Sequence, residues 1–367
     1  MCGFARRSGG ETEYDTMAVN ELLAAGLVAF YAALFWWAFR VLPGEGWQFL
    51  AAVPLTKRPD GQWVGLNLTY YGAFTASAVV LAVVWSVVLM SSVGLSLSSI
   101  LTLAAIVLGV CVPSAKGLAR LIEGKANTLT VGGASMFGLL LLPWVVMAMN
   151  VGLGALGEDA VPMTAVLAVV SIAYAFGEGT GRLACLSFGC CYGAPLEQSH
   201  PWLSTLFAHH HTAFVESTRK AAYERNLETI PLIPIQAMTA AVCVGAGVIG
   251  VWLFLRGQML AAFLVTVLVT QLWRVVSEYL RADYRGGRAF SLYQWLSLVG
   301  LLYAGLLALW LPDGPSVRPD LLRGVRTLWQ PGVLICLQVL WVVMFLFTGR
   351  SRVTRSTLSM QVIQDQI

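Results

Sequence analysis

Charged residues are scarce in this chain of 367 residues. Asp, Glu, Lys and Arg make up 11% of it, whereas an ordinary soluble domain has about 25%. Hydrophobic residues reach 57%, and the mean hydropathy is +0.73. So few charges do not cover a surface in contact with water, which excludes a soluble globular protein, and so much apolar material excludes a disordered chain. The composition predicts a membrane protein that crosses the bilayer several times.

An excess of charge of one sign is also missing. The net charge is +4 and the basic residues are scattered, so nothing indicates a nucleic acid, and anionic lipid is the partner that fits better. A regular cysteine framework is missing too, because the seven cysteines form an odd count with no repeated spacing. Three of them gather at Cys185, Cys190 and Cys191, and this group alone suggests chemistry.

Apolar runs bounded by charge, glycine or proline indicate the membrane spans. Each run is near the length of about 20 residues that crosses a bilayer as a helix. No run alternates polar and apolar residues as a barrel strand does, so we expect an all-α, polytopic transmembrane helical bundle. The first run lacks a small-residue cleavage site, which predicts an uncleaved span. The nine expected helices are 18–41, 70–93, 95–112, 131–152, 161–179, 232–255, 259–281, 289–311 and 333–348.

The longest polar interruption is an arm, defined here as residues 194–231. Opposite charges three and four positions apart over 215–225 predict a solvated helix in it. The arm holds all four histidines of the chain, which suggests metal binding or proton transfer at the membrane surface. Consecutive histidines point in different directions on a helix and make a poor ligand set, so we favour a polar rim. The histidines are His200, His209, His210 and His211.

Charged residues within the apolar runs are the strongest functional signal. A charge at the middle of a bilayer costs about 2.5 to 3.5 kcal/mol on insertion scales, so such residues line cavities or pair with one another. Arg274, Glu278 and Arg281 are spaced by four and three residues, which places them on one helix face. A charge cluster that reaches to the headgroups is the alternative, and it fits Arg281 better than Arg274. We favour the functional interpretation.

A second group of residues lies over 177–193, where five glycines and Arg182 close an apolar run. Glycines there let a backbone approach a ligand and leave N–H groups free to bind an anion. Arg182, Arg274 and Arg281 together suggest a clamp for a phosphodiester. Glu178 would orient Arg182, and Glu278 would orient Arg274. A polar, glycine-rich loop is also typical of transporters.

Five motifs stand in order along the chain: Thr69-Tyr70-Tyr71-Gly72, the glycine-rich Gly132–Gly138, the segment from Gly181-Arg182 to Gly193, Pro234-x-Gln236 and Arg274-x-x-x-Glu278-x-x-Arg281. In this order they resemble the motifs of the prolipoprotein diacylglyceryl transferase family. The resemblance covers a core of residues 70–311 with seven of the expected spans, including the polar arm. It leaves an N-terminal extension, 1–69, and a C-terminal extension, 312–367, each with one extra span.

The resemblance implies transfer of a diacylglyceryl group from phosphatidylglycerol, or a similar anionic phospholipid, to a cysteine thiol of a prolipoprotein. It implies a multi-pass protein of the bacterial inner membrane whose site faces the periplasm, although local Lys and Arg counts favour the opposite orientation. No metal and no organic cofactor are implied. Arg182 and Arg274 would stabilise the departing phosphate, with Glu278 holding an arginine. The substrate-binding candidates are Tyr71, which would contact the lipid headgroup, Gly181, Cys185, Gly189, Gly193, Gln236 and Arg281.

The chain also departs from the family pattern. Phe137 stands where the family has a histidine, which removes the obvious general base. Cys185 replaces an asparagine, and Cys190 and Cys191 replace a Glu-Leu pair. A different phospholipid-processing reaction, and a non-catalytic lipid-binding or transport protein, are therefore the alternatives. The cysteines themselves fit a Cys185–Cys190 disulfide, a catalytic cysteine, or small buried hydrophobic residues, the interpretation that we favour.

Overall fold

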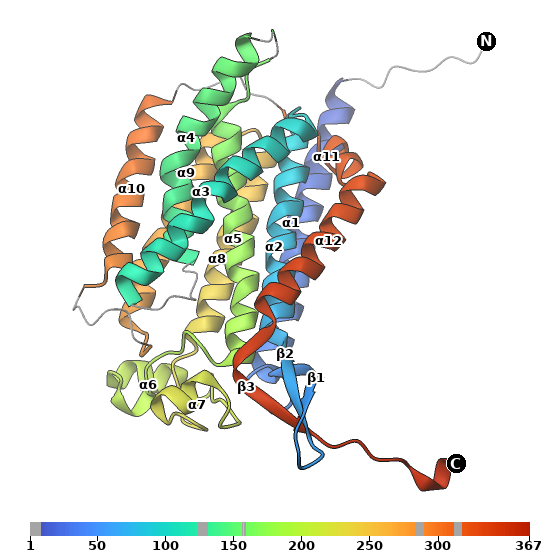
Figure 1. The fold of residues 1–367 in the computed structure, drawn as a ribbon. Helices are drawn as coiled ribbons and strands as arrows, with labels where there is room; N and C mark the ends of the chain where they lie inside the picture. Colours follow the sequence, from blue (N-terminus) through green and yellow to red (C-terminus); the bar gives the residue numbers. More distant parts are fainter. Residues whose placement is uncertain (1–8, 124–130, 156, 158, 284–289, 312–317) are drawn as a thin grey trace.

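The structure is a computed structural model that describes residues 9–123, 131–155, 157, 159–283, 290–311 and 318–367. Residues 312–317, which open the expected C-terminal extension, lie outside the described ones. Helices dominate the chain, and each of the nine apolar runs forms one (Figure 1). These helices are α1 (Gly9–Val41), α2 (Tyr70–Ser92), α3 (Leu97–Glu123), α4 (Val131–Ala155), α5 (Met163–Phe188), α8 (Ile235–Leu255), α9 (Met259–Tyr279), α10 (Leu292–Trp310) and α12 (Pro331–Thr348).

Eight helices of the described residues are long and apolar enough to cross a bilayer, which confirms the polytopic helical bundle. The helix expected at 95–112 forms α3, whose apolar part within the described residues is Leu97–Cys111. α3 runs obliquely across the other helices (Figure 1). Of the seven spans expected within 70–311, six are among these eight helices and the seventh forms α3.

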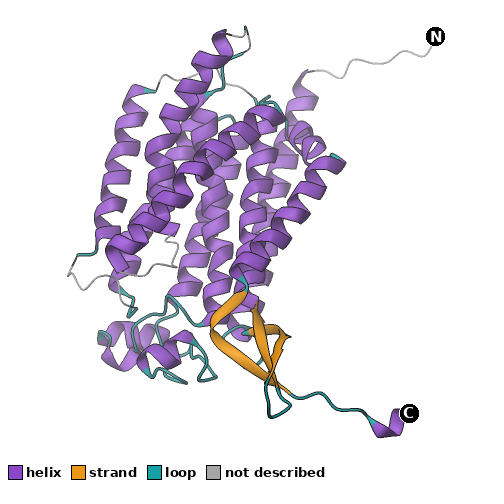
Figure 2. Ribbon diagram, viewed as in Figure 1, coloured by secondary structure: helices purple, strands orange, loops and turns teal. Residues whose placement is uncertain are grey.

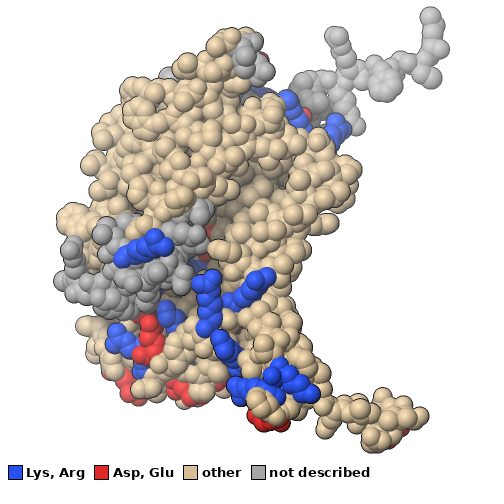
Figure 3. Space-filling view, viewed as in Figure 1, with Lys and Arg blue, Asp and Glu red and all other residues tan. Residues whose placement is uncertain are grey.

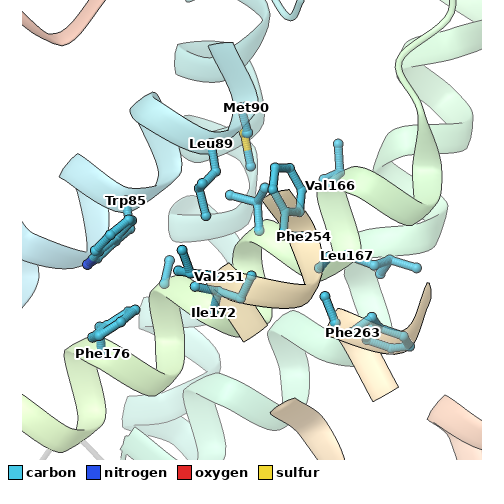
Figure 4. Packing of buried hydrophobic residues seen from close by; sticks show 14 of the residues in the cluster. Trp85, Leu89, Met90, Val166, Leu167, Ile172, Phe176, Val251, Phe254 and Phe263 are labelled. Atoms are coloured by element: carbon cyan, nitrogen blue, oxygen red, sulfur yellow. The ribbon is translucent and has the colours of Figure 1, made fainter. Parts of the chain in front are cut away.

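Helix α5 is the centre of the bundle and packs against α2, α8, α9 and α4. In its apolar stretch 72% of the residues are buried, compared with 11% in α12. The Phe176 ring of α5 stacks on Trp85 with 4.8 Å between ring centroids (Figure 4). A Cβ added at Gly247 of α8 would lie 3.0 Å from the Phe176 ring, so glycine there permits the close approach of α8. This packing fixes the axis of α5.

Three antiparallel strands form a small sheet at one end of the bundle, which the sequence does not predict (Figure 2). They are β1 (Phe49–Lys57), β2 (Trp63–Thr69) and β3 (Arg350–Leu358), with β2 in the middle. β1 is exposed at almost every residue, so no buried face imposes the alternating pattern that marks a strand. β3 lies near the other end of the chain, so no short turn in the sequence indicates that it pairs with β2. The sheet therefore adds to the expected helical bundle outside the membrane spans.

The two extensions pack on the core. The indole Nε1 of Trp341 in α12 donates to Ser77 Oγ of α2 at 3.0 Å. In the N-terminal half of α1, Glu21 accepts hydrogen bonds from Trp252 Nε1 at 2.9 Å and from Arg256 Nη2 at 2.6 Å. A short helix, α11 (Leu321–Leu328), precedes α12 and lies against α2. The helical body shows few charged residues in this view, and many Lys, Arg, Asp and Glu side chains gather at the end that carries the sheet (Figure 3).

The arm folds beside this same end, next to the sheet (Figure 1). It contains α6 (Pro201–Phe207) and α7 (Lys220–Arg225). The solvated helix expected over 215–225 is thus shorter than its charge pattern suggests. Arg219, directly before α7, has no exposed surface at all, so its assignment to a solvated face was wrong.

The buried guanidinium of Arg219 joins three segments of the chain. It donates to the carbonyl oxygens of Leu42 at 3.0 Å and Leu186 at 3.5 Å, and also to those of Ser187 and Gly44. Leu186 and Ser187 belong to the last turn of α5, whose carbonyls have no partner within the helix. Arg219 therefore holds the arm against the segment after α1 and against the end of α5.

We expect Arg219→Ala to lower the free energy of unfolding by about 3 kcal/mol, because it leaves several buried carbonyls without a donor. Thermal unfolding of the detergent-solubilised protein measures the change as a lower Tm. Arg225→Ala, at the end of α7, is the matched control and should leave the Tm nearly unchanged. Equal Tm values for the two variants would contradict this role of Arg219.

Candidate functional site

The glycine-rich segment that closes α5 is helical and not a loop. Residues 177–188 continue α5 to Phe188, so their N–H groups are engaged in the helix and not free for an anion, which corrects the sequence interpretation. The glycines bring in neighbouring helices instead. A Cβ at Gly179 would lie 2.8 Å from the Val244 side chain of α8, and one at Gly181 would lie 3.7 Å from Ala78 of α2. The polar groups that this segment offers are therefore side chains, such as those of Glu178 and Arg182, and not backbone N–H groups.

Two arginines from different helices converge on one carboxylate. Arg182 Nη2 contacts Glu178 Oε1 directly, as the spacing of four predicts, and Arg274 Nη2 of α9 lies 3.5 Å from the same oxygen. Arg274 also donates to the hydroxyl of Tyr174 at 2.6 Å. The Glu178 side chain is 4% exposed and each arginine side chain 14%. We call these four residues, Tyr174, Glu178, Arg182 and Arg274, the arginine clamp.

The arginine clamp has one more positive charge than negative charge. Buried cations are retained where a counter-charge or ligand compensates them. Arg182 Nε is buried and, within the described part of the chain, has no hydrogen-bond partner. An unsatisfied, buried N–H on a guanidinium indicates a place for an oxygen ligand. The clamp is therefore suited to bind an anion such as a phosphate.

The other charged candidates lie at the end of α9, with Glu278 in its last turn and Arg281 just after it. Arg281 pairs with Asp283 through two contacts, Nε to Oδ1 at 2.8 Å and Nη2 to Oδ2 at 3.0 Å. Glu278 accepts a hydrogen bond from Ser291 Oγ at 3.2 Å. Arg274 is held by Glu178 and Tyr174, and the orienting role of Glu278 toward Arg274 stays a prediction. Tyr174 was missed, although its spacing of four from Glu178 was a signal for it.

A tight turn follows α5 and folds the chain back on the helix. Gly189 has φ +72°, and its N–H donates to Cys185 O at 2.9 Å, which ends the helix in the left-handed manner typical of glycine. Cys190 N–H donates to the same oxygen at 3.2 Å. Gln236 Nε2 donates to Cys190 O at 3.0 Å and so holds the turn against α8. This assigns Gln236 and Gly189 a clear structural role at the site.

The turn brings three sulfur atoms together. The Sγ atoms of Cys185, Cys190 and Cys191 all lie within 4.8 Å of one another, and none of the three forms a disulfide. We call them the cysteine cluster. Arg182 Nη1 lies 4.0 Å from Cys185 Sγ, so the cluster adjoins the arginine clamp. Hydrogen bonds from Cys185 and Cys190, aided by Arg281 and Arg182, hold the pKa of Cys191 well below its usual value.

The remaining candidates surround these two groups. The Tyr71 ring, in the first turn of α2, lies 5.5 Å from that of Phe188, and Tyr71 is close to Cys190 and Cys185. Gly193 forms a β-bridge with Arg281, which joins the turn after α5 to the end of α9. Contact of Tyr71, Gly181, Gly189 and Gly193 with a substrate remains a prediction.

Phe137 and the histidines lie at exposed positions. Phe137 of α4 is 38% exposed. All four histidines are exposed on the arm, where His211 Nδ1 lies 3.0 Å from Ala208 O. Exposure agrees with the polar rim that the sequence favours for them. None of them belongs to the arginine clamp or to the cysteine cluster.

Comparison with known proteins identifies the family. No curated protein matches the sequence. The sequence profile of a family described as prolipoprotein diacylglyceryl transferase matches residues 62–310, which is more than half of the chain. The match includes the arginine clamp and the cysteine cluster. The chain is therefore a multi-pass membrane protein that belongs to the prolipoprotein diacylglyceryl transferase family.

Proposed function

We propose that the protein moves a diacylglyceryl group from phosphatidylglycerol, or a similar anionic phospholipid, to a cysteine thiol of a prolipoprotein or a related acceptor. Family membership supports a membrane transferase that acts on prolipoproteins. The observation that carries the proposal for this chain is the arginine clamp, in which Arg182 and Arg274 meet at Glu178 inside the helical bundle. No metal or organic cofactor is needed for this transfer.

In the proposed reaction the acceptor sulfur attacks the glycerol carbon that carries the phosphate. A carbon–sulfur bond forms, and the carbon–oxygen bond to the phosphate breaks. The electron pair of that bond leaves with glycerol phosphate, so negative charge grows on the departing oxygen. Two fixed guanidinium groups beside this oxygen stabilise that charge more than they stabilise the intact lipid, which lowers the barrier.

The clamp suits this task because its cations are fixed before the lipid arrives. Arg182 is held by Glu178, and Arg274 is held by Glu178 and Tyr174. Donors that are already oriented need no rearrangement when the charge develops. The unsatisfied Arg182 Nε supplies a further donor for a phosphate oxygen.

The acceptor must react as a thiolate, since a thiol is a poor nucleophile. Arg281 and Arg182 both act electrostatically on Cys191. An acceptor thiol placed beside the same arginines would meet the same field, which favours its anionic form. Phe137 carries no ionisable group, so we assign no general base to it.

The proposed location is the inner membrane of a bacterium, with the site facing the periplasm. The end of α5, the arm and the sheet share one end of the bundle (Figure 1). A secreted precursor would meet the site from that end. Tyr71 opens α2 at this end, which supports its proposed contact with the lipid headgroup.

Arg182→Ala and Arg274→Ala should each reduce transfer at least about a hundredfold, the loss typical of removing one donor that stabilises a developing anion. The assay uses cells depleted of their own diacylglyceryl transferase and measures the mass of precursor lipoproteins. Arg256→Ala is the matched control, since Arg256 pairs with Glu21 on the exposed surface. Full transfer by either clamp variant would overturn the proposed role of the clamp.

Lipid profiles of the same cells separate this proposal from the alternatives. A phospholipid that appears or disappears while precursors stay unmodified would indicate a different phospholipid reaction. Unchanged lipids and unchanged precursors, from a wild-type protein that inserts normally, would indicate a non-catalytic lipid-binding protein.

Glu178→Gln should lower kcat by about tenfold or more while KM for the lipid changes little. Loss of the carboxylate leaves both arginines to attract the phosphate but no longer fixes them in the position that favours the transition state. Initial rates against the mole fraction of phosphatidylglycerol in mixed micelles separate the two parameters. A raised KM with unchanged kcat would show that Glu178 serves binding alone.

A further inference from the structure

The cysteine cluster has the dimensions of a metal site. A zinc–sulfur bond is about 2.3 Å long, and tetrahedral geometry then places neighbouring sulfurs about 3.8 Å apart. The three Sγ atoms already lie within 4.8 Å of one another, so only small side-chain rotations separate them from that arrangement. Cys190 is buried, and Cys185 and Cys191 are half-buried.

The backbone of the cysteine cluster is strained at Cys191. Cys191 has φ +55°, a left-handed conformation that non-glycine residues rarely adopt. Such strain persists only where the surroundings impose it. Here Gly189 reverses the chain and Gln236 holds Cys190 O at 3.0 Å, which together direct Cys190 and Cys191 back toward Cys185. The strained turn is what brings the three sulfurs together.

The charges around the cluster suit an anionic metal complex. Three thiolates and one divalent ion carry a net charge of −1, and three thiolates with a monovalent ion carry −2. Arg182 and Arg281 act electrostatically on Cys191, and Lys220 acts on Cys190. Arg182 and Arg281 also pair with Glu178 and Asp283, so these cations offset part of the negative charge of the complex.

The other interpretations explain less of this arrangement. Cysteines packed as small hydrophobic residues need neither convergence nor neighbouring cations. A disulfide would use two of the sulfurs and leave the third without a role. Thiolate ligands select soft ions with a filled d shell, of which zinc and monovalent copper are the common ones in proteins.

We propose that Cys185, Cys190 and Cys191 form a three-thiolate binding site for a thiophilic metal ion, Zn²⁺ or Cu⁺. Zinc would have one further ligand beyond the three sulfurs, and monovalent copper would be three-coordinate. The site goes beyond the proposed transfer reaction, since metal binding stands whether or not the protein is a transferase. It adjoins the arginine clamp through the contact of Arg182 with Cys185.

The test measures metal in the full-length protein, purified in detergent under reducing conditions with any affinity tag removed. The protein is incubated with equal amounts of zinc and monovalent copper and then freed of loosely bound ions. We expect about one ion per chain by mass spectrometry and three sulfur neighbours by X-ray absorption, at about 2.3 Å if the ion is zinc. The coordination number then tells zinc from copper.

Single variants assign the ligands. Cys185→Ser, Cys190→Ser and Cys191→Ser should each weaken retention of the ion at least about tenfold. Cys336→Ser, which changes an exposed cysteine of α12, and the triple variant His209→Ala, His210→Ala, His211→Ala are the controls and should retain it. Tm values confirm that each variant is folded.

Three results would overturn the site. They are the absence of a retained ion in the wild-type protein, an ion whose neighbours are only nitrogen or oxygen, and equal loss of the ion in Cys336→Ser. Thiol titration of the metal-free protein gives a further check, because a disulfide within the cluster in the presence of reductant would also contradict the proposal.

Discussion

A buried carboxylate between two guanidinium groups is the interaction on which the rest of the site depends. Two like charges roughly 6 Å apart repel by about 3 kcal/mol at an effective dielectric constant of about 20, so Arg182 and Arg274 would not share a buried place without Glu178. The carboxylate compensates one of the two charges and leaves the other for a ligand. It also joins α5 to α9, since one arginine comes from each helix.

The spans and part of the clamp follow from local sequence alone. A long apolar run forms a helix in hydrocarbon because no water is present to satisfy its backbone, and a spacing of four places Glu178 beside Arg182 on any helix. A prediction from local sequence was wrong for the glycines that follow Phe176. Gly177, Gly179 and Gly181 suggest a loop, yet they remain helical because α2 and α8 pack against the side that lacks a Cβ.

Contacts between distant segments account for the remaining differences. β3 pairs with β2 across most of the chain, and its polar, exposed sequence gives no local sign of a strand. Arg219 lies in a charged stretch that predicts solvent exposure. It is buried instead, because it donates hydrogen bonds to carbonyls just after α1 and in the last turn of α5. In both cases the partner is supplied by tertiary structure, which a pattern of spacings within one segment does not contain.

One face of α5 links the two chemical groups of the site. Tyr174, Glu178, Arg182 and Cys185 follow one another at spacings of four, four and three, so they line a single helix face. The core around Phe176 holds that helix rigidly, and the arm caps its end through Arg219. A phosphate at the arginines and a sulfur at the cysteines would therefore have a fixed separation. Fixed positions for the leaving group and for a thiol are what a displacement at carbon requires, because orientation alone supplies much of the lowering of its barrier.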